Sequence, residues 1–171
     1  MSGGSTRRRF PKGRETSERA CRVIIGLGSN LDGPAKLDAA IEEISYEYDL
    51  LVRSTRYVSP PVEGAEGDPV APYSNAAVLI RTTDDHDTLK ATLRRIEERL
   101  GRDRSDPTSV AIDLDILLIE DRVVRRGTEV LVPHPDLLVR RHAAIPSAEV
   151  APFMRHSLTE VPLAEIAEQL A

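Results

Sequence analysis

The chain has 171 residues, of which 40% are hydrophobic, and this size and composition suit one compact domain with its own core. The formal net charge of −5 argues against a general nucleic-acid binder, and a single cysteine, Cys21, excludes an intramolecular disulfide framework and a cysteine-rich zinc site. No apolar run approaches the roughly 20 residues that span a bilayer, and no apolar segment follows the N-terminal arginines as in a secretory signal. We therefore expect a cytoplasmic protein that binds neither membranes nor nucleic acid.

Residues 1–21 are rich in glycine, serine and arginine and show no periodicity, which predicts a disordered basic arm ahead of a folded domain over residues 22–171. The run CRVIIGLGSN then predicts a buried strand that leads into a turn. A first helix is predicted from residue 33 to residue 44, because Pro34 suits a first helical turn. Apolar residues recur there at helical spacing, at Leu37, Ala40, Ile41 and Ile44.

The middle of the chain alternates strand and helix signals. The β-branched run LLVRSTRYV predicts a second strand, closed by Ser59–Pro60–Pro61. An acidic loop with glycines and prolines follows over residues 62–72 and is long enough to suggest a function. SNAAVLIRT predicts a third strand, and residues 84–101 predict a second helix with acids in its first turn and a glycine at its end. The apolar positions of that helix are Leu89, Leu93, Ile96 and Leu100.

The run VAIDLDILLIE predicts a fourth strand and completes the order β-α-β-β-α-β, which is that of the split ferredoxin-like fold. We therefore expect an α+β domain in which both helices cover one face of an antiparallel sheet. Residues 122–171 are expected to add a short hairpin, the loop VPHPDLLVRR and closing helices, of which the last is LAEIAEQL.

Asp113 and Asp115 are the strongest chemical signal in the sequence. Residues two apart on a strand share a face, so both carboxylates point away from the core that Ile112, Leu114 and Ile116 enter. Two adjacent carboxylates repel and lose hydration on an apolar strand, which is costly unless a cation compensates. Since Mg²⁺ prefers one or two carboxylates together with substrate phosphates, the pair predicts a magnesium site. The alternative is a solvent-facing strand on which both carboxylates stay hydrated.

The remaining polar motifs are less specific on their own. Leu27–Gly28–Ser29–Asn30 follows the first strand but matches neither a P-loop nor a dinucleotide-binding motif, and glycine and asparagine are common turn residues. Pro133–His134–Pro135, followed by Arg140, places an imidazole and a guanidinium on one constrained loop, although a histidine in such a loop is more often a turn or surface residue. The sequence contains no HExxH or GxSxG motif.

Taken together, the motifs GLGSNL, YSNAAV, IEERLGRDR, AIDLDILL and VPHP, in this order and spacing, resemble the 6-hydroxymethyl-7,8-dihydropterin pyrophosphokinases of folate biosynthesis. The resemblance covers residues 22–171. It implies transfer of the β,γ-diphosphate of ATP to the hydroxymethyl group of the pterin, with release of AMP. ATP is then the co-substrate, and two Mg²⁺ ions are held by Asp113 and Asp115. The implied partners are the small molecules ATP and a reduced pterin, and we expect a monomer or weak homo-oligomer.

The resemblance also implies roles for individual residues. The pterin pocket of the family contains the residues that match Tyr73 and Asn75, and Ser59 and Pro60 stand where a Thr-Pro pair usually frames that pocket. Nucleotide and phosphates are bound in the family by the residues that match Glu97, Arg102, His134 and Arg140. Of these, Arg102 and Arg140 are expected to act in catalysis together with the two aspartates.

The sequence departs from the family just before Asp113. The family has an Arg-Trp-Gly-Pro-Arg-like stretch there, in a mobile loop that closes on triphosphate and pterin. This chain has the shorter stretch SDPTSVAI, with Val110 in place of the last arginine and no tryptophan anywhere. His142 stands where the family commonly has a phenylalanine that stacks on the pterin, and we expect it to contact substrate. Arg141 beside it is a candidate replacement cation.

Two further interpretations stay open because of these departures. A diverged relative would use another pterin or another alcohol acceptor. A non-enzymatic paralogue would bind nucleotide or pterin without forming AMP. Release of AMP rather than ADP distinguishes a pyrophosphokinase from an ordinary kinase, and magnesium-dependent binding of ATP would exclude a purely structural protein.

Overall fold

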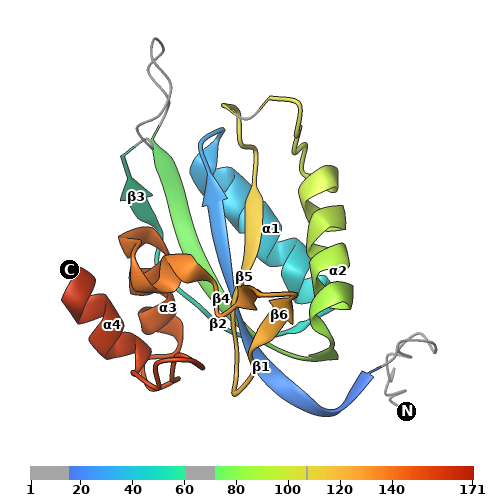
Figure 1. The fold of residues 1–171 in the computed structure, drawn as a ribbon. Helices are drawn as coiled ribbons and strands as arrows, with labels where there is room; N and C mark the ends of the chain where they lie inside the picture. The colour runs from blue at the N-terminus through green and yellow to red at the C-terminus, as the bar shows by residue number, and fades with distance from the viewer. Residues whose placement is uncertain (1–15, 61–71, 107) are drawn as a thin grey trace, which may run out of the picture.

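A computed structural model of the chain describes residues 16–60, 72–106 and 108–171 (Figure 1). The strands are β1 (Thr16–Ser29), β2 (Asp49–Arg53), β3 (Tyr57–Ser59), β4 (Tyr73–Asp84), β5 (Asp113–Ile119), β6 (Val124–Arg126) and β7 (Glu129–Val132). The helices are α1 (Gly33–Glu47), α2 (His86–Arg99), the short 3-10 helix η1 (Pro135–Leu138), α3 (Arg141–Val150) and α4 (Leu163–Leu170).

The main sheet has the order β2-β4-β1-β5, with β3 also paired to β4, and every pairing is antiparallel. This order and the chain order of the first strands and helices confirm the predicted α+β, ferredoxin-like arrangement. The predicted C-terminal hairpin is β6–β7, and the predicted closing helices are α3 and α4. Within the described residues β5 lies at the edge of the sheet, paired with β1 on one side.

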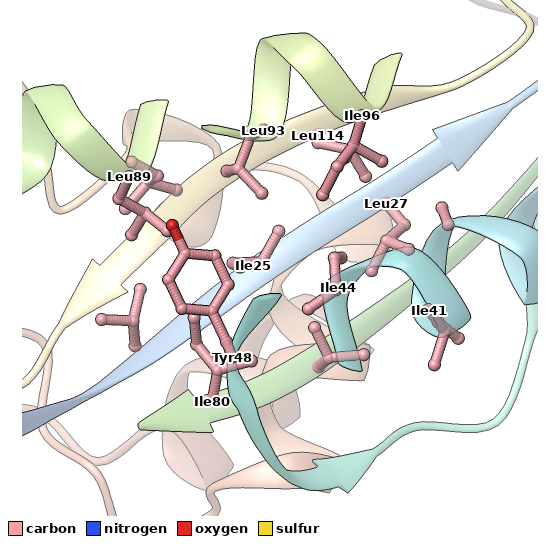
Figure 2. Close-up of a cluster of buried hydrophobic side chains, with 14 of the residues drawn as sticks. Ile25, Leu27, Ile41, Ile44, Tyr48, Ile80, Leu89, Leu93, Ile96 and Leu114 are labelled. Carbon is pink, nitrogen blue, oxygen red and sulfur yellow. The ribbon is translucent and has the colours of Figure 1, made fainter. Parts of the chain in front are cut away.

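Hydrophobic side chains pack on both faces of the sheet. On one face, α1 and α2 cover Ile25 and Leu27 of β1 and Leu114 of β5, as predicted for these two helices. Figure 2 shows Leu93 and Ile96 of α2 packed over this face. On the opposite face, α3 and α4 cover Ile24, Ala77 and Leu79, among other residues. The central strand β1 is therefore buried between two helical layers, and its neighbours are fixed in register against it.

Local sequence accounts for both N-terminal helices. Pro34 lies in the first turn of α1, and the residues predicted to face the core are all buried: Leu37, Ala40, Ile41 and Ile44. In α2 the Asp85 carboxylate accepts the Thr88 backbone N–H at 2.8 Å and caps the first turn. Gly101 follows the helix with φ +89°, a left-handed conformation that suits glycine after a helix end. Leu89, Leu93 and Ile96 are buried in α2 as predicted, whereas Leu100 is only partly buried.

The predicted second strand is divided into two in the structure. β2 ends at Arg53 and β3 begins at Tyr57. Ser54, which lies between them, donates its backbone N–H to the Ala77 carbonyl at 2.9 Å, and its Oγ accepts the Ala77 N–H at 2.9 Å. A side chain therefore replaces a backbone acceptor in the ladder, which ends the regular pairing at this point.

The N-terminal boundary also differs from the prediction. β1 begins at Thr16, where it pairs with Asp84 of β4, so residues 16–21 belong to the sheet and not to a disordered arm. Residues 1–15 of the predicted arm and residues 62–71 of the predicted acidic loop lie outside the described residues. No helix in the described part of the chain is long and apolar enough to cross a membrane.

Replacing Leu93 by alanine tests the α2 packing. Leu93 is fully buried against the sheet, so Leu93→Ala should lower the free energy of unfolding by about 2–5 kcal/mol. Leu158→Ala, at a leucine that is 48% exposed, is the matched control and should change it by less than about 1 kcal/mol. Urea unfolding followed by circular dichroism measures both, and equal effects would contradict the assigned core.

Candidate active site

A hollow opens over β1 because two residues of that strand lack side chains. Gly26 and Gly28 lie on the same face of β1, in register with Asp115 and Asp113 of β5. A Cβ atom added at Gly28 would lie 3.5 Å from Asn75 Oδ1, and one added at Gly26 would lie 2.8 Å from Leu117 Cδ1. Bare backbone thus forms the floor of the hollow. The sequence prediction assigned Gly28 to a turn, whereas β1 continues to Ser29.

The walls of this hollow, here called the acidic hollow, come from five parts of the fold. Side chains from β4, β5, the loop at His134, η1 and α3 surround the floor, with Leu27 of β1 beside it: Tyr73, Asn75, Asp113, Asp115, Leu117, His134, Asp136, His142 and Ala143. The structure therefore brings the predicted aspartates together with four of the other predicted site residues, Tyr73, Asn75, His134 and His142.

The two aspartates occupy the positions predicted for them. Ile112, Leu114 and Ile116 are buried on the face of the sheet that α1 and α2 cover, so Asp113 and Asp115 project from the other face into the acidic hollow. Burial, and then the charge of Asp115, raise the pKa of Asp113 above its ordinary value. Three cations oppose that shift: Arg102, Lys90 and Arg104. Repulsion within the pair is therefore only partly balanced by the protein itself.

Glu97 of α2 lies behind the pair and not in the hollow. Its side chain is 1% exposed, its Oε1 accepts the Leu114 backbone N–H at 2.7 Å, and its Oε2 pairs with Arg104. Burial raises the pKa of Glu97, the Leu114 N–H lowers it, and the charge of Asp113 raises it further. Both oxygens are engaged with the protein, so the geometry makes Glu97 a positioning residue for the strand between the aspartates. A direct contact of Glu97 with nucleotide stays a prediction.

Three polar side chains gather on the other wall of the hollow. The His134 backbone N–H donates to the Leu117 carbonyl at 2.8 Å, which attaches the loop to β5 beside Asp115. Asp136 Oδ2 lies 4.0 Å from His134 Nδ1 and 4.0 Å from His142 Nε2. Burial lowers the pKa of His142, and Asp136 opposes that shift. Sequence reasoning did not include Asp136, although its position two residues after His134 in a constrained loop is a usable signal.

Asn75 is held rigidly at the opposite end of the hollow. It is 5% exposed, and its Nδ2 donates to Ser59 Oγ at 2.8 Å. Its Oδ1 faces Gly28. Tyr73 pairs with Ser59 in the sheet and lines the hollow beside Asn75. Burial raises the pKa of Tyr73, so the phenol stays protonated at neutral pH and can donate a hydrogen bond.

Ser59 and Pro60 border a second hollow that adjoins the first. Its lining comes from β3, the residue after it and α3: Tyr57, Val58, Ser59, Pro60, Arg141, His142 and Ile145. His142 lines both hollows. The predicted frame of the pocket is therefore adjacent to the predicted pocket residues, and Arg141 faces the second hollow and not the aspartates.

The predicted arginines lie around the acidic hollow without lining it in the described part of the chain. Arg102 donates from a guanidinium nitrogen to the Ser109 carbonyl at 3.4 Å, while its buried Nε has no hydrogen-bond partner among the described residues. Its charge acts on both Asp113 and Tyr73, so the guanidinium is close to the hollow. Arg140 is exposed at the N-terminus of α3, and its charge acts on His142.

The residues before β5 are attached to the end of β1. Ser29 Oγ donates to the Ala111 carbonyl at 2.7 Å, and Asn30 donates from Nδ2 to the Thr108 carbonyl at 2.8 Å. Asn30 Oδ1 accepts the Val110 N–H at 2.7 Å, and Val110 is buried. The Ser29–Asn30 pair, which is a weak motif in the sequence, therefore fixes the segment that carries Val110.

The donor set of the acidic hollow fits magnesium bound together with phosphates. The described residues contain no group of three or more histidine, cysteine or acidic side chains able to hold a metal by themselves. Asp113 and Asp115 supply two carboxylates over an open floor, so the remaining ligands of an octahedral Mg²⁺ would be water and phosphate oxygens.

Comparisons with known proteins agree with this geometry. Residues 24–152 match the family described as 7,8-dihydro-6-hydroxymethylpterin-pyrophosphokinase (HPPK). Relatives named 2-amino-4-hydroxy-6-hydroxymethyldihydropteridine pyrophosphokinase are 32% identical in Synechocystis, over 76% of this chain and 66% of the relative, and 32% identical in Aquifex aeolicus, over 84% and 88%. Wild-type HPPK-DHPS of Plasmodium falciparum with pteroate has a TM-score of 0.67 at 12% identity, over 92% of this chain and 43% of that chain, which shows a shared fold.

Replacing Asp113 by asparagine tests the electrostatic strain of the site. Because the pKa of Asp113 is raised in the folded state, its ionised form destabilises the metal-free protein at neutral pH. Asp113→Asn should therefore raise the melting temperature at pH 7 in EDTA by about 2–4 °C. The gain should vanish as the pH falls below the ordinary pKa of aspartate, where both states are protonated. Asp87→Asn, at a side chain that is 86% exposed, is the control, and a gain as large there would contradict the assignment.

Proposed function

We propose that this chain, which belongs to the 7,8-dihydro-6-hydroxymethylpterin-pyrophosphokinase family, transfers the β,γ-diphosphate of ATP to the hydroxymethyl group of 6-hydroxymethyl-7,8-dihydropterin. The hydroxymethyl oxygen attacks the β-phosphorus and loses its proton to solvent, the bond between the β-phosphorus and the bridging oxygen to the α-phosphorus breaks, and AMP leaves with that oxygen. The observation that carries the proposal is the juxtaposition of Asp113 and Asp115 with Tyr73 and Asn75 over a glycine floor. One half of the hollow suits a metal-bound triphosphate and the other half suits a flat polar ring.

Two magnesium ions held by Asp113 and Asp115 would neutralise the phosphate oxygens and orient the β-phosphorus for attack. The protein places these carboxylates through β5, whose inward residues are buried and whose Leu114 peptide is bound by Glu97. Catalysis of this kind consists largely of positioning and charge compensation. A strand fixed on both its core face and its edge provides the required rigidity.

Asn75 and Tyr73 would bind the pterin. The Asn75 amide is fixed by its bond to Ser59, which leaves Oδ1 directed at the floor where a ring N–H can donate to it. Tyr73 adds an aromatic surface and a hydroxyl donor. His142 would close the pocket from α3 in place of a larger aromatic ring, with Pro60 behind it.

His134, Arg102 and Arg140 would contact the nucleotide and its phosphates. His134 lines the acidic hollow next to the aspartates. Arg102 lies close enough for its charge to act on Asp113 and Tyr73, and its buried Nε has no hydrogen-bond partner among the described residues. A cytoplasmic location and a monomeric or weakly self-associating state remain part of this proposal.

Mixing the protein with ATP, Mg²⁺ and the pterin and following AMP by chromatography tests the activity. AMP in proportion to pterin pyrophosphate is the expected result. Asp115→Ala should lower the rate by about 10³-fold or more, because one of the two metal-binding carboxylates is lost. Asp87→Ala is the matched control and should leave the rate unchanged. Pterin binding without AMP would instead support a non-enzymatic binder, and AMP with a different acceptor would support a diverged relative.

Tyr73→Ala separates the two halves of the pocket. Loss of the ring should weaken pterin binding about tenfold while the affinity for Mg-ATP stays within about twofold. Isothermal titration with each ligand measures both affinities, and Tyr46→Ala, at a tyrosine that is 65% exposed, is the control. An equal loss of both affinities would contradict the placement of the pterin beside Tyr73.

A further inference from the structure

Lys90 is a cation of the site that the sequence prediction did not include. Leu114 lies between the two aspartates, and its backbone N–H and carbonyl point to the edge of β5 that β1 does not pair. Side chains from α2 satisfy both of its polar groups: Glu97 accepts the N–H at 2.7 Å, and Lys90 Nζ donates to the carbonyl at 3.1 Å. Lys90 and Glu97 lie about two turns apart on the same face of α2, and this spacing is the signal in the sequence that could have identified the lysine.

The Lys90 ammonium also reaches Asp115. Nζ lies 3.3 Å from Asp115 Oδ1, and the two side chains are 29% and 41% exposed. The Leu114 carbonyl anchors the ammonium at this position, so the pair does not depend on two freely moving surface chains. Lys90 therefore contacts the same carboxylate that the proposed function assigns to magnesium.

We propose that Lys90 is a placeholder cation, whose ammonium compensates Asp115 in the metal-free protein and competes with divalent metal for that carboxylate. The proposal rests on the metal assignment of the proposed function. An ammonium and a metal ion compete because each binds the carboxylate by its positive charge and each weakens the other's attraction by repulsion. Lysine suits exchange, because its flexible stem and several donors allow it to release Asp115 while it keeps the Leu114 carbonyl.

This arrangement favours metal that arrives with a triphosphate. An aqueous ion must displace Lys90 with only two carboxylates as compensation. A nucleotide-bound ion brings phosphate oxygens, which supply further ligands for the metal and an anionic partner for the released ammonium. The protein thus disfavours loading by free metal and retains a site for the metal–nucleotide complex.

Manganese binding to the full-length chain without nucleotide tests the proposal, with free Mn²⁺ measured by its electron paramagnetic resonance signal. Lys90→Met and Lys90→Gln should bind Mn²⁺ about three- to tenfold more tightly than the unmodified chain, because a repelling charge is removed. Lys90→Arg should restore the weaker affinity. Lys36→Met is the matched control, because Lys36 also donates to a backbone carbonyl, that of Leu100, at 2.7 Å, and it should leave the affinity unchanged.

Equal or weaker Mn²⁺ binding in the two neutral Lys90 variants would overturn the proposal. A gain that persists when Asp115→Asn is also present would overturn it too, because the lysine would then act on another group. If Asp113→Asn and Asp115→Asn leave the binding of Mn²⁺ unchanged, the metal assignment itself fails, which is a different outcome from the loss of the Lys90 effect. Circular dichroism confirms folding of each variant, and the glutamine variant keeps a donor for the Leu114 carbonyl.

Discussion

The rest of the structure depends on β1, which must fill the core along one part of its length and leave space for the site along another. β1 must be apolar where α1 and α2 cover one face and α3 and α4 cover the other, and Val23, Ile24 and Ile25 meet that requirement. Further along, the same strand must leave space, and Gly26 and Gly28 provide it. Because β4 and β5 both pair with β1, the loss of side chains at these two positions opens a hollow between Asn75 on one neighbour and the aspartates on the other.

The electrostatics of the hollow follow from its position at the sheet edge. Asp113 and Asp115 are close enough to repel, and the cations near them come from α2 and from the segment after it. Helix α2 therefore does more than cover the core. Leu93 and Ile96 attach it to the sheet, while Glu97 and Lys90 bind the edge of the strand that carries the carboxylates. Packing of the core and placement of charge are two results of one helix orientation.

The sequence predicted the parts of this molecule that periodicity controls. The ferredoxin-like order, both N-terminal helices and the opposite faces of the two aspartates and of Leu114 and Ile116 all follow from apolar spacing and helix end signals. The family resemblance identified Tyr73, Asn75 and His134 as residues that the fold then brings together. Features that depend on contacts between distant residues were not accessible: the interruption by Ser54 needs its Ala77 partner, and the bond of Lys90 to Leu114 needs the edge of β5. Gly28 looked like a turn residue because composition alone does not distinguish a turn from a strand without side chains.

The attachment of Thr108, Val110 and Ala111 to Ser29 and Asn30 has a thermodynamic consequence. A connection that is ordered during folding loses its conformational entropy once, and ligand binding does not have to supply that free energy again. The residues of this connection that Ser29 and Asn30 bind are therefore already held in place before any ligand arrives. A segment held in this way adds less to the entropic cost of association than a freely moving loop of the same length.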